Sequence, residues 1–176
     1  MKKLFLILFC FMAMFNVTQA RYNKIILDRI ELMEDVPWML EYSYNKYGEK
    51  DKIIAAECGQ WSMKNRIKVK LDGVLISFEA PWSKLKTVEQ ISFLFDSKTE
   101  IIMTDVEEQE YDGVKIGKAF FISKSDKNYK KLINKMKTSN YMSILMEDTE
   151  GNIERIVKVK NTDSYKVLTA FENSLK

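Results

Sequence analysis

Apolar and polar residues alternate along much of this chain, which is the two-residue period of a strand with one buried face. The pattern is clearest in RIKVKLDGVLISFEA, where Ile67, Val69 and Leu71 alternate with lysines before the pair Asp72-Gly73. An Asp-Gly pair between two alternating runs predicts a β-hairpin with a tight turn. Further strands are predicted in EQISFLF, TEIIMTDV, DGVKIGKAFFI, YMSILME and NIERIVKVK, the last two joined by the turn-forming sequence DTEGN.

Two segments follow the helical period instead. In SKSDKNYKKLINKMKT the apolar residues recur at i, i+3, i+4 and i+7, and either Ser125 or Asp126 is available as an N-cap. These apolar positions are Tyr129, Leu132, Ile133 and Met136. The terminal NTDSYKVLTAFENSLK predicts a short closing helix, with Thr162 or Asp163 as the cap. Its apolar face consists of Leu168, Phe171 and Leu175.

The opening segment KIILDRIELM is ambiguous, because its apolar residues fit a helical stripe about as well as a strand, and we interpret it as a third helix. No internal repeat, low-complexity tract or linker interrupts the chain. We therefore predict one domain over residues 21–176 of a mainly β (α+β) class. It should form an antiparallel β-sandwich or a strongly curved sheet with two or three short helices.

The first twenty residues have the order of a secretory signal. Lys2 and Lys3 precede an apolar run from Leu4 to Phe15, and small and polar residues lead to Ala20. This run is shorter than the roughly 20 residues that a membrane-spanning helix needs. We expect cleavage after Ala20, export to the periplasm or the extracellular space, and no transmembrane span in the mature chain.

The charge of the chain argues against nucleic acid as a partner. The full sequence has 28 basic and 25 acidic residues, and removal of Lys2 and Lys3 brings the two nearly into balance. A balanced surface has no strong field to attract phosphate backbones. Lysines nevertheless cluster around the internal helix, and Lys127, Lys130 and Lys131 mark a possible binding surface for anionic lipid or an envelope polymer.

The absence of histidine excludes Ser-His and Cys-His nucleophiles and the usual zinc sites. We predict neither a cofactor nor a catalytic residue set. Cys58, in IIAAECGQWSM, is the one cysteine left after the signal, so it cannot form an internal disulfide. Its default interpretation is a packed free thiol, because a free cysteine behaves as a small buried hydrophobe. The alternative is an intermolecular disulfide.

Carboxylate pairs can do acid–base work without histidine. The acidic run DVEEQEYDG supplies Glu107, Glu108, Glu110 and Asp112, which are the first candidates for that alternative. The same run resembles the opening of a calcium loop, but Ala119 stands where a bidentate glutamate is required. We therefore predict no metal site.

Aromatic residues provide a second class of candidate contact. Trp38 is in phase with Leu40 and Tyr42 and is expected in the core, whereas Trp61 and Trp82 stand in less periodic settings. A tryptophan at an exposed position can serve as a binding contact. We retain Trp61 and Trp82 as candidates for such a surface.

The C-terminal portion, IGKAFFISKSDKNYKKLINKMKTSNYMSILMEDTEGNIERIVKVKNTDSYKVLTAFENSL, resembles the end of secreted bacterial proteins of the invasion-associated locus B type. The likeness covers the order strand, helix, strand pair turning at glycine, and terminal helix. It implies an exported β-rich protein with a cell-envelope or host-interaction role, and no site residue carries over. The sequence thus predicts a non-catalytic binding protein whose partner, an envelope component or another protein, and oligomeric state remain open. A small carboxylate-dependent enzyme is the alternative.

Overall fold

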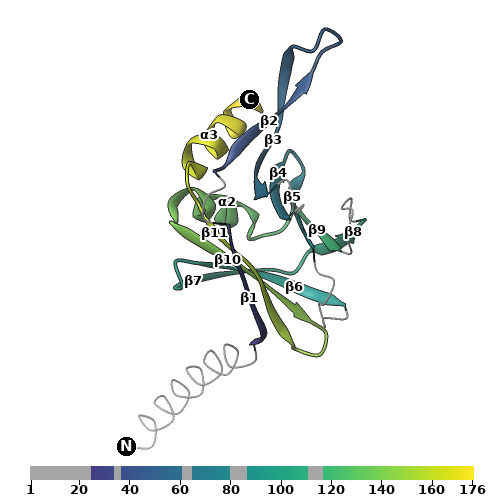
Figure 1. Cartoon of the computed structure of the whole chain (residues 1–176), viewed down its shortest axis with the longest axis vertical. Helices are drawn as coiled ribbons and strands as arrows, with labels where there is room; N and C mark the ends of the chain where they lie inside the picture. The colour runs from purple at the N-terminus through teal and green to yellow at the C-terminus, as the bar shows by residue number, and fades with distance from the viewer. Residues whose placement is uncertain (1–24, 34–36, 61–64, 80–86, 111–116) are drawn as a thin grey trace, which may run out of the picture.

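The computed structural model describes residues 25–33, 37–60, 65–79, 87–110 and 117–176, and within them the chain forms eleven strands and two helices (Figure 1). One sheet has the order β1-β11-β10-β6-β7. Its strands are β1 (Ile25–Met33), β11 (Ile153–Lys160), β10 (Tyr141–Asp148), β6 (Val88–Phe95) and β7 (Thr99–Met103). The second sheet has the order β2-β3-β4-β5-β9-β8. Its strands are β2 (Met39–Tyr44), β3 (Lys50–Gln60), β4 (Asn65–Lys70), β5 (Gly73–Glu79), β9 (Gly117–Ser123) and β8 (Val106–Gln109).

Antiparallel pairing dominates both sheets, and the β1–β11 pair is parallel. The two helices are α2 (Tyr129–Thr138) and α3 (Ser164–Ser174). The predicted mainly β, α+β class is therefore confirmed. No helix in the described residues is long and apolar enough to cross a membrane.

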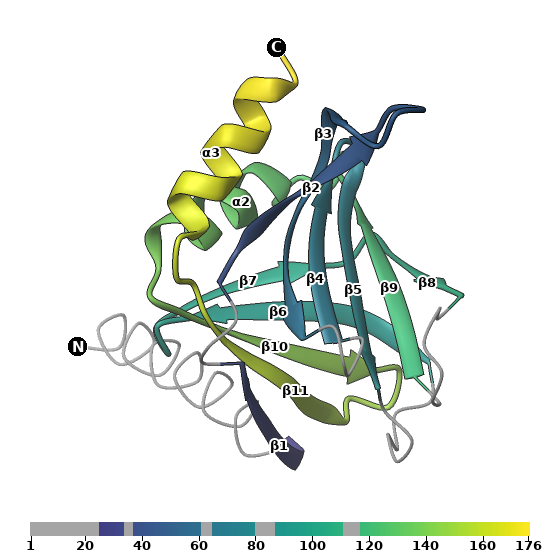
Figure 2. The same ribbon diagram turned by 45° about the horizontal axis from the view of Figure 1, so that its top comes forward.

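One core joins the two sheets and both helices. Its fully buried members include Ile76 and Phe120 from the six-stranded sheet, Phe93 from the five-stranded sheet, and Leu132 and Leu168 from the helices. In Figure 2 the strands of the two sheets cross, and α2 and α3 lie along one side of the core. The helices thus cover the core where the sheets leave it open.

The predicted hairpin is formed by β4 and β5, with Val69 opposite Val74 and Ile67 opposite Ile76. The turn itself lies one residue earlier than the Asp-Gly pair suggests, because Gly73 already belongs to β5. Gly73 pairs with Ser123 of β9, and a Cβ at this position would lie 2.1 Å from the carbonyl oxygen of Ile122. Close approach of a neighbouring strand therefore requires glycine here.

The prediction of a helix in KIILDRIELM is wrong, because Ile25–Met33 forms β1. Its local pattern fits both structures, and the parallel pairing with β11, more than a hundred residues away in the sequence, provides the strand with its hydrogen bonds. The segment TEIIMTDV is also divided. Thr99–Met103 forms β7 and Val106–Gln109 forms β8, so the chain passes from one sheet to the other at Thr104 and Asp105.

Both predicted helices are present. The predicted stripe of α2 is buried in full: Tyr129, Leu132, Ile133 and Met136. Its N-cap is Asn128, not Ser125 or Asp126, because the Asp126 carboxylate accepts the Asn128 N–H at 2.7 Å in a turn before the helix. Asp163 is the N-cap of α3, as predicted, and Leu168 and Phe171 are buried. Leu175 lies just past the helix and is 41% exposed, so it departs from the predicted apolar face.

Candidate binding pocket

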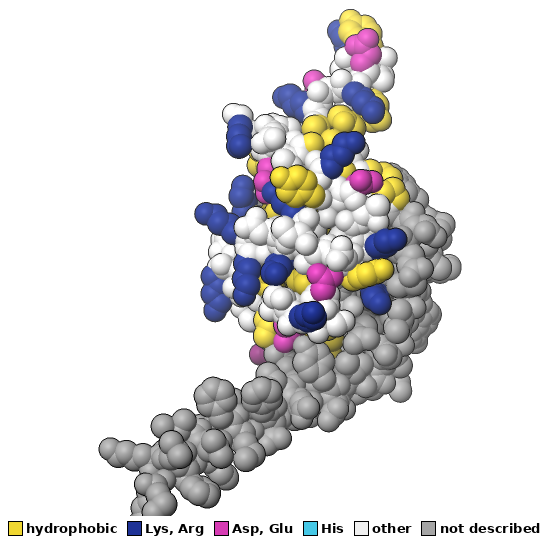
Figure 3. All heavy atoms as spheres, turned by 90° about the vertical axis from the view of Figure 1, so that its left-hand side faces the viewer, with side chains coloured by type: hydrophobic (Ala, Val, Ile, Leu, Met, Phe, Trp, Pro, Cys, Tyr) yellow, Lys and Arg dark blue, Asp and Glu magenta, His cyan; other side chains and the backbone are white. Residues whose placement is uncertain are grey.

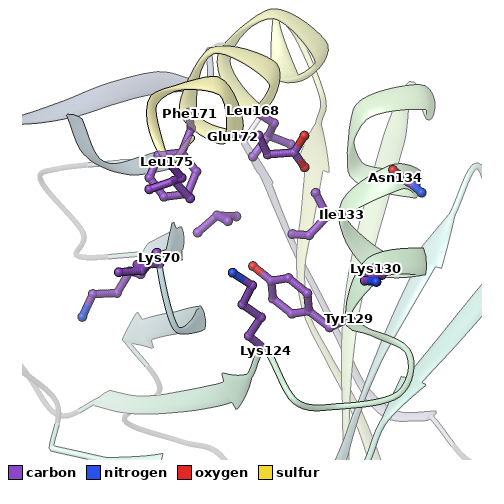
Figure 4. Close-up of a pocket in the computed structure, with 12 residues that line it drawn as sticks. Lys70, Lys124, Tyr129, Lys130, Ile133, Asn134, Leu168, Phe171, Glu172 and Leu175 are labelled. Atoms are coloured by element: carbon purple, nitrogen blue, oxygen red, sulfur yellow. The ribbon is translucent and has the colours of Figure 1, made fainter. Parts of the chain in front are cut away.

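A pocket of about 420 Å³ lies between α2, α3 and the turn that joins β4 to β5. Figure 4 shows side chains from the two helices and from the turn surrounding it. Small-molecule sites typically occupy about 300–1,000 Å³, so the pocket has room for a ligand of modest size. We call it the interhelical pocket.

The floor of the interhelical pocket is apolar. Ile133 projects into it from α2 and Leu168 and Phe171 from α3, and all three are buried. They face the pocket because the stripe of each helix turns toward the core, so a gap between the stripes is lined with hydrocarbon. Leu71 and Leu175, which are 60% and 41% exposed, extend this apolar lining to the rim. The rim is therefore accessible to an apolar group from solvent.

Basic side chains surround this apolar floor. Lys70, Lys124 and Lys130 line the pocket and are exposed residues. The single acidic residue among its lining residues is Glu172, whose carboxylate accepts a hydrogen bond from the Lys137 ammonium at 2.5 Å. Three lysines and one ion-paired carboxylate thus give the lining residues a net positive charge.

Tyr129 adds a hydroxyl to this setting. In Figure 4 the hydroxyl of Tyr129 and the ammonium of Lys124 both point into the cavity. Burial, together with the carboxylates of Glu172 and Asp72, raises the pKa of Tyr129 from 10.0 to about 12. The phenol therefore keeps its proton at neutral pH and can donate a hydrogen bond there.

The lysines predicted around the internal helix are exposed, but they do not all line the interhelical pocket. Lys130 lines the interhelical pocket, whereas Lys127 and Lys131 are not among its lining residues. Figure 3 shows basic side chains outnumbering acidic ones on the side of the molecule that lies at the left of Figure 1. Sequence reasoning did not single out Lys70 or Lys124. Lys70 ends β4, which only the fold brings to α2, whereas Lys124 lies in the loop directly before α2.

The predicted aromatic contacts differ in outcome. Trp61 and Trp82 are outside the described residues, as is Asp112. Trp38 is buried at 3% exposure, and its indole N–H donates to the Asn161 side-chain oxygen at 3.4 Å. Trp38 is therefore part of the core, as predicted.

Cys58 is completely buried in the core on β3. Burial, together with the neighbouring Glu57 carboxylate, raises its pKa from 9.0 to about 12. A thiol with such a pKa has almost no thiolate at neutral pH. The packed-thiol interpretation is confirmed, and an intermolecular disulfide would require Cys58 to leave the core.

The acidic run does not form a converging site within the described residues. Glu107 pairs with Phe121 and Glu108 with Phe120, so the two carboxylates leave opposite faces of β8. The Glu108 carboxylate forms an ion pair with the Lys118 ammonium at 3.5 Å, and Glu110 is exposed. Within the described residues no three His, Cys, Asp or Glu side chains come together as a metal site.

A smaller hollow of about 190 Å³ lies on the outer face of the six-stranded sheet, where Arg66, Lys68 and Ser77 line it. The Lys68 ammonium contacts the carboxylates of Glu41 at 2.8 Å and Glu57 at 3.5 Å. The charge of Lys68 is thus already compensated. This hollow is a weaker candidate for a ligand than the interhelical pocket.

Comparison of the chain with known protein families, with curated proteins and with solved structures gave no match. The functional argument therefore depends on the chemistry of the pocket.

Proposed function

We propose that this protein is an exported, non-catalytic binding protein and that its ligand inserts an apolar group into the interhelical pocket. The observation that supports binding is the accessible apolar floor formed by Ile133, Leu168 and Phe171. Binding sites are typically concave and mostly apolar with a few polar groups at defined positions, and the pocket has this composition. The resemblance of the C-terminal portion to secreted invasion-associated locus B proteins is in keeping with a role at the cell envelope.

Export is supported by the order of charge, apolar run and small-residue site in residues 1–20. Mass spectrometry of the protein recovered from the periplasm or the medium should find an N-terminus at Arg21. An intact Met1 on membrane-bound protein would refute this part of the proposal.

Binding is tested with Nile red, an uncharged fluorophore whose emission rises in apolar surroundings. The purified protein, stripped of endogenous ligand on hydrophobic beads, should bind the dye saturably. The variant Asn134→Trp should weaken that binding, because Asn134 is an exposed residue of α2 that lines the pocket and an indole there adds bulk at the rim. Lys131→Trp is the matched control, since Lys131 is exposed on the same helix and does not line the pocket. Equal dye binding by both variants would refute the assignment to this pocket.

A further inference from the structure

We infer that the ligand of the interhelical pocket is an amphipathic anion, namely a single apolar chain that ends in one carboxylate group. This inference rests on the proposed function and specifies the chemical class of the ligand. It follows from how the polar and apolar parts of the pocket are separated.

The apolar part lies at depth and the cationic part at the rim. Leu168 and Phe171 are 0% and 2% exposed, whereas Lys70, Lys124 and Lys130 are exposed. A ligand that buries a hydrocarbon chain against the floor must therefore place its other end among these lysines. A neutral head would gain no attraction from the lysine charges, and a cationic head would be repelled by them.

Two hydrogen-bond donors point into the cavity. Figure 4 shows the Lys124 ammonium and the Tyr129 hydroxyl directed into it, and a carboxylate has two oxygens that can accept from such donors. Lys70 lines the pocket, but its ammonium points away from the cavity in Figure 4, so Lys124 is the main cationic contact for the head group. The negative charges nearby are those of Asp72, which is exposed on the turn, and of Glu172, which pairs with Lys137.

The volume of the pocket limits the size of the hydrocarbon tail that it can hold. About 420 Å³ lies near the lower end of the range for small-molecule sites. A ligand with one chain fits this space better than a lipid with two chains. The proposal therefore commits to a free single-chain carboxylate and not to a bilayer surface.

The test is displacement of Nile red from the stripped protein by three probes with the same chain: dodecanoate, dodecanol and dodecyltrimethylammonium. We expect dodecanoate to displace the dye at a concentration about tenfold lower than dodecanol, and the cationic probe to be the weakest. Charged groups enter apolar surroundings less readily than alcohols, so tighter binding of dodecanoate cannot come from apolar burial alone. Added salt should weaken the binding of dodecanoate and leave the binding of dodecanol unchanged, because salt screens exposed charges.

Variants of the rim identify the residues that select the anion. Lys124→Gln should reduce the affinity for dodecanoate about fivefold and leave that for dodecanol unchanged. Tyr129→Phe keeps the aromatic ring that lines the pocket and removes only the hydroxyl, so it should also weaken the binding of dodecanoate and not that of dodecanol. Lys131→Gln is the control on α2 that should bind like the wild type, and retained Nile red binding shows that each variant is folded.

The outcomes separate this inference from the proposed function. Equal displacement by dodecanoate and dodecanol would overturn the anion inference while the binding proposal stands. Absence of Nile red binding to the wild type would overturn both. Sedimentation of the Asn134→Trp variant with phosphatidylglycerol vesicles, together with no effect of dodecanoate on the wild type, would assign the basic face to a membrane surface and overturn the inference.

Discussion

Gly73→Ala should be one of the most destabilising single-methyl changes in this protein. A Cβ at residue 73 would lie 2.1 Å from the carbonyl oxygen of Ile122 and 2.6 Å from Cζ of Phe121. Carbon atoms in comfortable contact are about 3.5 Å or more from their neighbours, so β5 and β9 would have to move apart by more than about 1 Å at this point. The aromatic ring could rotate away, but the carbonyl oxygen is fixed by the strand to which it belongs.

The cost follows from what that movement breaks. The pairing of Gly73 with Ser123 ends the β5–β9 ladder. Next to it, the backbone N–H of Lys124 donates to the backbone carbonyl oxygen of Asp72 at 2.8 Å. Each lost hydrogen bond costs about 1 kcal/mol, and displacement of the fully buried neighbours Val74 and Ile122 adds about 1–3 kcal/mol. We expect the free energy of unfolding to fall by about 2–4 kcal/mol.

Urea unfolding followed by tryptophan fluorescence measures this loss. The matched control is Gly48→Ala, because Gly48 has φ +80 and nothing within 4 Å of a Cβ. Gly48→Ala therefore tests left-handed backbone strain without a clash and should cost about 1 kcal/mol. A Gly73→Ala variant that is as stable as Gly48→Ala would refute the argument from close approach.

Three further predictions concern the core and one turn. Cys58, which is 0% exposed with a pKa of about 12, should react with a bulky thiol reagent at least about a thousandfold more slowly in the native protein than in denaturant at the same pH; rapid native labelling would show that the thiol is accessible. Because the folded pKa values of Cys58 and Tyr129 are raised from 9.0 and 10.0 to about 12, their contribution to stability is complete below pH 9 and is lost as pH rises toward 12. Urea unfolding measured at a series of pH values should show the free energy of unfolding falling between pH 9 and 12. Cys58→Ala should make this fall less steep, and an unchanged fall would contradict the role given to Cys58. Ser97→Gly should raise the free energy of unfolding by about 0.5–1 kcal/mol, since Ser97 has φ 56 in the turn between β6 and β7, and a loss of stability would contradict the strain.

Local patterns sufficed for elements whose buried face is set by their own residues. The stripe of α2 is fully buried because four apolar residues at helical spacing must face the core together. The β4–β5 hairpin likewise has the register that alternation and a short turn impose, with Val69 opposite Val74. In both cases the prediction does not depend on knowing which other element packs against the segment.

Where the partner decides the structure, the sequence was insufficient. The segment Ile25–Met33 becomes a strand through pairing with β11, because its isoleucines favour a strand while its apolar spacing fits a helix equally well. The change of sheet at Thr104 and Asp105 likewise has no local signal, since TEIIMTDV reads as one strand. The interhelical pocket is the extreme case, because Lys70, Lys124 and α3 meet only in three dimensions.

The two leucines whose burial the sequence misjudged nevertheless mark the pocket. Leu71 is in phase with the buried Ile67 and Val69, and Leu175 continues the apolar face of α3, so both are predicted to be inside. Both are instead exposed, at 60% and 41%, and both line the interhelical pocket. Apolar residues that are patterned for burial but left in solvent lose the stabilisation that burial provides, and such local inconsistencies are expected at functional sites. A ligand chain in the pocket would cover both leucines and restore that burial. Leu175→Ser should therefore weaken binding of dodecanoate and dodecanol alike with little effect on the free energy of unfolding, whereas a large loss of stability without a change in binding would show that Leu175 serves the fold alone.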